Sequence, residues 1–105
     1  MEIRLVYFED CPNWRLAHDR LRTALELLHR GDEPVQFTLV ASPAEAVAAG
    51  LHGSPTILVN GNDPFPHRAE DAWSCRLYAN EGGVEGAPSV RALVEVLSEA
   101  TGREE

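Results

Sequence analysis

The chain has 105 residues, 44% hydrophobic and 25% charged, which predicts one globular domain over residues 1–105 and excludes a disordered or repetitive chain. Its formal charge of −8, from 17 acidic and 9 basic residues, argues against nucleic acid or an anionic membrane as a partner. The apolar run at residues 3–8 is far shorter than the ~20 residues of a membrane span and has acidic neighbours, unlike a secretion signal. We therefore expect a cytoplasmic protein, whose cysteines rest as thiols unless they do redox work.

The first predicted elements are a strand and an amphipathic helix. Residues 3–8 are β-branched, aromatic and almost all apolar, which is typical of a buried strand. Proline is tolerated at the first position of a helix, so Pro12 places Cys11 at the N-cap of a helix that runs to about Arg30. Gly31 is expected to end this helix. Its apolar residues recur at three- and four-residue steps: Trp14, Ala17, Leu21, Leu25 and Leu28.

The middle of the chain predicts two more strands around a short helix. Residues 35–41 alternate as a strand, with Val35, Phe37 and Leu39 on one side. Ser42-Pro43 is typical of a helix start, and Gly50 closes a helix over residues 44–49. Residues 55–59 form the third strand, followed by a hairpin-turn signal at Asn60-Gly61.

The last third of the chain gives a helix and an ambiguous return strand. Pro88 opens a helix whose apolar face holds Val90, Leu93, Val94 and Leu97. The return strand is either 63–67, which two prolines would confine to a sheet edge, or 73–78, which alternates better. We favour 73–78. The predicted order is therefore β-α-β-α-β-β-α.

Cys11 is the first candidate functional residue, because the sequence places its thiol at a helix start. Backbone N–H groups and the positive end of the helix dipole stabilise a thiolate there, the form that attacks disulfides and binds soft metals. The carboxylates of Glu9 and Asp10 oppose this effect. The alternative is a small N-cap residue with no chemistry.

Ser54-Pro55 is the second candidate, at the entry to the third strand. A proline is allowed at the first residue of a strand, and a small fraction of X-Pro bonds is cis. A cis bond would turn the backbone N–H and C=O of Ser54 outward, ready to pair with an extended peptide.

These features together resemble the thioredoxin superfamily, in which a Cys-x-x-Cys motif opens the first helix beside a cis-proline loop. The resemblance implies a thioredoxin-like α/β fold, with a central mixed sheet and helices on both faces. It further implies thiol–disulfide exchange without a cofactor. Cys11 matches the attacking cysteine of that family and Pro55 its cis-proline, which makes Pro12, Trp14, Ser54 and Pro55 candidate substrate-binding residues. The chain departs from the family where Trp14 stands in place of the second cysteine, so no local disulfide can close.

Cys75 is the other cysteine, and two interpretations of it stay open. If residues 73–78 form a strand, Trp73, Cys75 and Leu77 share a face, and Cys75 is a buried small hydrophobe. Alternatively, Cys75 is a distant resolving thiol that pairs with Cys11, which requires their Cα atoms to lie within about 7 Å.

A narrower resemblance connects the chain with small bacterial proteins described as thioredoxin-like or alkylmercury lyase-like. It includes Gly-Ser-Pro-Thr-Ile-Leu-Val, Asp-Pro-Phe, Ser-Cys-Arg-Leu-Tyr and Glu-Gly-Ala-Pro-Ser-Val. Cys11 and Cys75 would there hold a soft metal and Asp10 would supply a proton, but the chain is much shorter than such a lyase. The four histidines have no metal-ligand spacing: His18, His29, His52 and His67. His52 is either a base near the thiol or a loop-packing residue.

The sequence thus predicts thiol–disulfide exchange through Cys11, with Cys75 as a candidate for the distant resolving thiol and protein or small-molecule thiols and disulfides as partners. Two alternatives stay open. One is a non-catalytic module that binds a peptide or a small thiol beside Pro55. The other is a soft-metal-binding protein that uses both thiolates, for mercury or copper.

Overall fold

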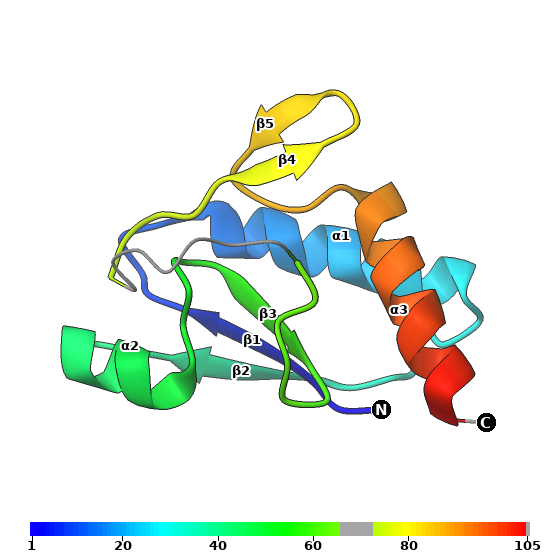
Figure 1. The fold of residues 1–105 in the computed structure, drawn as a ribbon, viewed down its shortest axis with the longest axis horizontal. Coiled ribbons are helices and arrows are strands. Elements are labelled where there is room, and N and C mark those ends of the chain that lie inside the picture. Colours follow the sequence, from blue (N-terminus) through cyan, green and yellow to red (C-terminus); the bar gives the residue numbers. More distant parts are fainter. Residues whose placement is uncertain (66–72, 105) are drawn as a thin grey trace.

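Three strands form the central sheet of the computed structural model, which describes residues 1–65 and 73–104, the last two by backbone alone. They are β1 (Ile3–Tyr7), β2 (Val35–Leu39) and β3 (Thr56–Val59), in the order β2-β1-β3 (Figure 1). β1 runs parallel to β2 and antiparallel to β3. β1 is thus the central strand, as its nearly continuous apolar sequence predicts.

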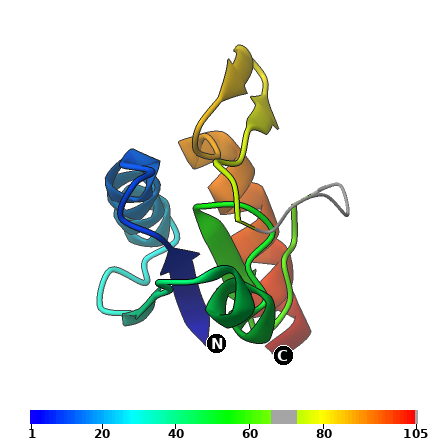
Figure 2. The same ribbon diagram turned by 90° about the vertical axis from the view of Figure 1, so that its left-hand side faces the viewer.

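Helices cover both faces of this sheet: α1 (Asn13–Leu27), α2 (Pro43–Ala49) and α3 (Val90–Glu104) (Figures 1 and 2). Ile3 and Leu5 of β1 pack in one apolar cluster with α1 and α3. Val6 points the other way and packs in a second cluster with Ala46 of α2 and with Cys11. The expected α/β class, with a mixed sheet between helices, is confirmed.

Val35, Phe37 and Leu39 lie on one side of β2, as predicted, but the strand ends at Leu39 and not at residue 41. Val35 is half-buried, but Phe37 and Leu39 are about half exposed, because β2 lies at the sheet edge. Phe37 instead packs edge-on against Tyr7 and Trp14, with ring centroids 6.3 and 6.1 Å away. The aromatic contacts, rather than a covering element, bury part of this strand.

The predicted return strand over 73–78 is also wrong. The strand that follows is β4 (Tyr78–Asn80), which pairs with β5 (Gly83–Glu85) in a separate two-stranded sheet. Of residues 73–77, Cys75 alone forms a bridge, a parallel one to Ser54, which lies before the first residue of β3, so this segment does not pair with β3 itself. For the alternative over 63–67, residues 63–65 are not a strand, and 66 and 67 lie outside the described residues.

Helix α1 is shifted from its predicted bounds at both ends. Pro12 is the N-cap, so Cys11 lies one residue before it, in a turn where its N–H donates to the Phe8 carbonyl. At the other end, His29 takes the left-handed conformation, with φ 60°. The N–H groups of His29 and Arg30 donate to the carbonyls of Glu26 and Leu25, the Schellman pattern. His29, and not Gly31, therefore ends the helix.

We expect His29→Gly to raise the free energy of unfolding by about 0.5 kcal/mol, since relief of the left-handed strain exceeds the added chain entropy of glycine. Urea denaturation followed by circular dichroism measures the change. Gly31→Ala is the matched control and should not lower stability, because Gly31 has no left-handed φ and alanine reduces the chain entropy of the unfolded state. A larger loss from Gly31→Ala than gain from His29→Gly would show that Gly31 ends the helix.

The local signals for the short helix and the hairpin turn are confirmed. The Ser42 hydroxyl accepts from the Glu45 N–H at 3.2 Å, and Gly50 closes α2 with φ 79°. Asn60 and Gly61 both have positive φ, as their turn requires. Among the described helices, none has the length and apolar content that crossing a membrane demands.

Candidate functional site

A disulfide joins the two cysteines across 64 residues of chain. Cys11 and Cys75 lie with their Cα atoms 6.0 Å apart, within the range that a disulfide spans. Cys11, just before α1, is fully buried in the second apolar cluster, whereas Cys75 is exposed. The interpretation of Cys75 as a buried hydrophobe is therefore wrong, and the pairing interpretation agrees with the structure.

Ser54 forms hydrogen bonds with the two segments that bear the cysteines. Its hydroxyl accepts from the Phe8 N–H at 3.2 Å, at the end of β1 that leads to Cys11. Its backbone N–H donates to the Ser74 carbonyl at 2.7 Å, and its carbonyl accepts from the Arg76 N–H at 3.0 Å. The Ser54-Pro55 peptide bond is cis. The backbone groups of Ser54 thus pair with residues on both sides of Cys75. The expectation that they are ready to pair with an extended peptide is therefore wrong for this structure, because the chain itself occupies them.

Gly53 allows this close approach. It has φ 91°, and a Cβ placed on it would lie 2.9 Å from Cβ of Arg76 and 3.4 Å from the Ser74 carbonyl oxygen. Any larger residue would push the segment around Cys75 away from the Ser54 loop.

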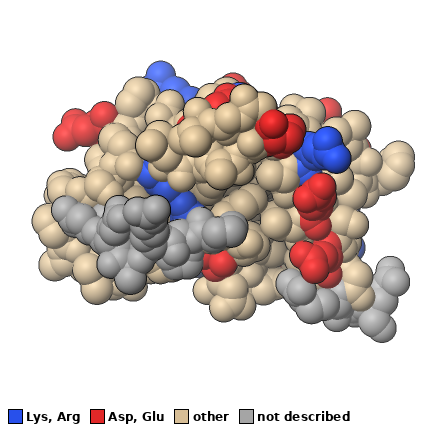
Figure 3. Space-filling model, turned by 45° about the horizontal axis from the view of Figure 1, so that its top comes forward, with Lys and Arg blue, Asp and Glu red and all other residues tan. Residues whose placement is uncertain are grey.

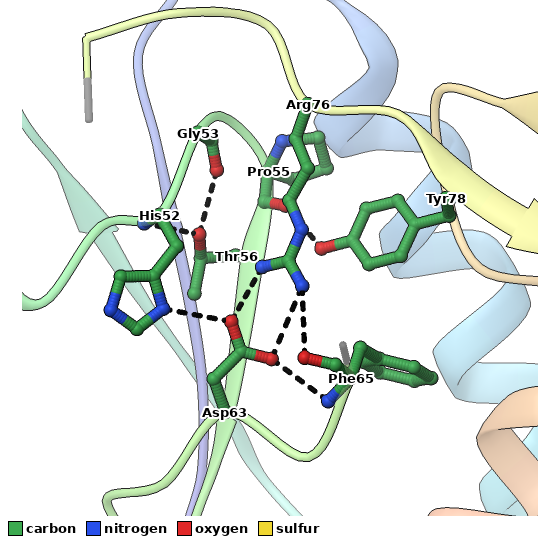
Figure 4. Close-up of polar contacts among 8 residues, drawn as sticks. All are labelled: His52, Gly53, Pro55, Thr56, Asp63, Phe65, Arg76 and Tyr78. Atoms are coloured by element: carbon green, nitrogen blue, oxygen red, sulfur yellow. Dashed lines mark hydrogen bonds and ion pairs between the residues drawn. The ribbon is translucent and has the colours of Figure 1, made fainter. Parts of the chain in front are cut away.

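A buried ion pair holds the residue after Cys75 (Figure 4). The guanidinium of Arg76 contacts the Asp63 carboxylate at 2.5 Å and donates to the Phe65 carbonyl at 3.3 Å. The side chains of Arg76 and Asp63 are 5% and 1% exposed. Burial alone would raise the pKa of Asp63, but hydrogen bonds from Arg76, His52 and the Phe65 N–H outweigh it and hold that pKa below its ordinary value.

Two further residues complete this network in Figure 4. Nδ1 of His52 lies 2.9 Å from the Asp63 carboxylate, so His52 contacts the ion pair. Tyr78 donates from its hydroxyl to the Pro55 carbonyl at 2.5 Å, and its ring lies 4.4 Å from the Arg76 guanidinium carbon. Burial raises the pKa of Tyr78 above its ordinary value, which keeps it a hydrogen-bond donor at neutral pH.

Tyr78→Phe is expected to lower the free energy of unfolding by about 1 to 2 kcal/mol, because the buried Pro55 carbonyl loses its donor. Urea denaturation at neutral pH measures this loss. Tyr7→Phe, on a partly buried ring, is the control and should change stability by less than about 0.5 kcal/mol. Equal effects of the two substitutions would remove the assigned role of the Tyr78 hydroxyl.

The other predicted site residues lie outside these contacts. Pro12 is exposed at the N-cap of α1. Trp14 stacks on Tyr7 with ring centroids 4.5 Å apart and lies beneath the Arg15 guanidinium, so its observed role is packing. Asp10, the proposed proton donor of the lyase resemblance, is exposed.

No metal centre is evident in the described parts of the chain. Residues 1–65 and 73–104 contain no group of three or more His, Cys, Asp or Glu side chains that would hold an ion. His18 packs edge-on against Phe37, and His67 lies outside the described residues. A soft metal would therefore depend on the two cysteine thiolates, as a pair.

Sequence reasoning missed Gly53, Asp63, Arg76 and Tyr78, which seat the segment around Cys75. The signal available was the narrower resemblance, since Asp-Pro-Phe and Ser-Cys-Arg-Leu-Tyr contain three of these residues. Comparison of the chain with protein-family models, curated proteins and solved structures finds no match. The case for function therefore depends on the geometry.

Proposed function

We propose that the chain is a thioredoxin-like protein of thiol–disulfide exchange, with Cys11 and Cys75 as its redox couple. The observation that carries the proposal is the disulfide between a helix-start cysteine and a cysteine seated on the Ser54-Pro55 loop. The order β-α-β-α-β before the return hairpin, and the helices on both faces of a mixed sheet, support the thioredoxin-like fold.

The reaction needs no resident cofactor. The reduced dithiol gives two electrons and two protons to a substrate disulfide, becoming the Cys11–Cys75 disulfide and releasing two thiols. A thiol reductant then reverses the step on the protein. In the cytoplasm, the compartment expected from the sequence, such a disulfide forms transiently during catalysis and is not a permanent structural cross-link.

The partners in this proposal are protein or small-molecule thiols and disulfides, and the net charge of −8 argues against nucleic acid or an anionic membrane. On the face drawn in Figure 3, separate groups of acidic and arginine side chains stand among uncharged described residues. This pattern lacks the broad basic area by which a protein neutralises phosphates.

An insulin-reduction assay with dithiothreitol as the electron donor tests the proposal. The wild-type protein should accelerate insulin precipitation over dithiothreitol alone, and Cys11→Ser should lose the acceleration because the couple is broken. Ser98→Ala on the exposed face of α3 is the matched control and should retain the full rate. Equal rates for wild type and Cys11→Ser would refute the proposal.

A soft-metal-binding role is the second candidate, favoured by the 6.0 Å separation of the two Cα atoms. When reduced, the two thiolates stand close enough to ligate one soft cation together, such as Hg²⁺ or Cu⁺. Stoichiometric uptake by the reduced wild type, lost in both Cys11→Ser and Cys75→Ser, would support it. Uptake that survives in either single variant would contradict it.

A further inference from the structure

The two cysteines of the disulfide lie in opposite environments. Cys11 is 0% exposed and packs in the apolar cluster with Val6, Phe8 and Leu51. Cys75 is exposed, on the segment that pairs with Ser54. The disulfide therefore extends from the protein core to the surface.

This asymmetry decides where an incoming thiolate can react. In thiol–disulfide exchange the thiolate approaches the attacked sulfur in line with the S–S bond, from the side opposite the sulfur that leaves. For attack on Cys11 that side is the apolar cluster, which excludes an ionic nucleophile. For attack on Cys75 the approach comes from solvent.

We infer that Cys75 is the substrate-facing sulfur and Cys11 the buried partner, the reverse of the order that the family resemblance implies. This inference rests on the proposed function. An external thiolate attacks Sγ of Cys75, the Cys11–Cys75 bond breaks, and Cys11 leaves as a thiolate that takes a proton from solvent. The new disulfide joins Cys75 to the external thiol, and a second thiol releases it.

The same order holds in the direction of substrate reduction. The thiolate of Cys75 attacks the substrate disulfide and expels one substrate thiolate. The thiolate of Cys11 then attacks Sγ of Cys75, re-forms the protein disulfide and expels the second substrate thiolate. The position of Cys11 directly before α1 suits a leaving and returning thiolate, because the helix N-terminus stabilises its negative charge.

Contacts that do not involve sulfur keep Cys11 covered in the reduced protein. Ser54 pairs its backbone N–H and C=O with Ser74 and Arg76, on either side of Cys75. The Arg76 guanidinium pairs with the Asp63 carboxylate. Because Gly53 has no side chain, Ser74 and Arg76 can pack directly against it. Opening the S–S bond breaks none of these contacts, so Cys75 stays outside and Cys11 inside.

Single-cysteine variants, reduced and mixed with Ellman's reagent, test this order. We expect Cys11→Ser, which keeps Cys75, to release thionitrobenzoate at least about tenfold faster than Cys75→Ser, which keeps Cys11. The two rates should become similar in urea, where the fold no longer covers Cys11. As a second measurement, reduced wild type treated with limiting iodoacetamide should carry the first label on Cys75 in peptide mapping.

The ion pair between Arg76 and Asp63 can be tested with a matched pair of variants. In the Cys75→Ser background, Arg76→Met should raise the reactivity of Cys11 several-fold, because the segment above it is loosened. Arg91→Met, which changes an exposed arginine on α3, should leave the reactivity of Cys11 unchanged.

The outcomes separate this inference from the proposed function. Faster reaction of Cys11, equal rates for both cysteines, or first labelling of Cys11 would overturn the order, whereas insulin reduction by the wild type could still succeed. Failure of the wild type in the insulin assay would refute the exchange function, even if Cys75 proved the more reactive thiol.

Discussion

Replacing Cys75 with alanine is expected to lower the free energy of unfolding of the oxidised protein by about 4 kcal/mol. The disulfide closes a loop of 64 residues, and a cross-link of this span restricts the unfolded chain by about that amount. Because Cys75 is exposed, the substitution itself removes little packing. Urea denaturation of wild type and variant, under oxidising conditions, measures the difference.

The reductant supplies the control for this prediction. With dithiothreitol present the cross-link is absent from both proteins, so their unfolding free energies should agree within about 1 kcal/mol. A difference of the same size with and without dithiothreitol would mean that Cys75 stabilises the fold by contacts other than the disulfide.

Asp63→Asn is expected to lower the free energy of unfolding by about 3 kcal/mol or more at neutral pH. The substitution removes the carboxylate with which the buried Arg76 guanidinium pairs, and a buried charge that loses its counter-charge is costly. The matched control is Glu95→Gln, which breaks the exposed contact of Glu95 with Arg91, where the side chains are 70% and 73% exposed. This control should cost less than about 0.5 kcal/mol, and an equal loss would contradict the role of burial.

The difference between wild type and Asp63→Asn should depend on pH. The folded pKa of Asp63 is lowered, so its ionisation stabilises the fold above the unfolded pKa of about 3.9 and this contribution is lost as the pH falls through the lower folded value. The stability gap should therefore be widest at neutral pH and narrow below about pH 4. Urea denaturation at neutral and acidic pH measures it, and a gap that is constant with pH would contradict the assignment.

Local signals in the sequence predicted the elements that local chemistry determines. The Ser42 cap, the closing Gly50 and the Asn60-Gly61 turn each depend on contacts within a few residues, and each is observed. The return strand over 73–78 failed because alternation alone cannot show which edge a segment pairs with. Leu77, expected on a buried face, is 69% exposed.

The candidate site was likewise predictable only where local signals mark it. A cysteine before a helix and a proline before a strand mark Cys11 and Pro55 in the sequence. The pairing of Cys75 with Cys11 and with Ser54 instead arises from the packing of segments distant in the chain. Asp63 and Arg76 look like ordinary surface charges in the sequence. Their pairing follows from burial, which the spacing of charged residues does not encode.

Ser54 links the end of β1 to the segment that bears Cys75 through hydrogen bonds alone, in addition to the disulfide. Its hydroxyl holds the end of β1, and its peptide groups hold the segment that bears Cys75. An alanine here would keep the backbone pairing with Ser74 and Arg76 and remove only the hydrogen bond from the Phe8 N–H. When the S–S bond is open, the Ser54 hydroxyl therefore still joins the two segments that bear the cysteines.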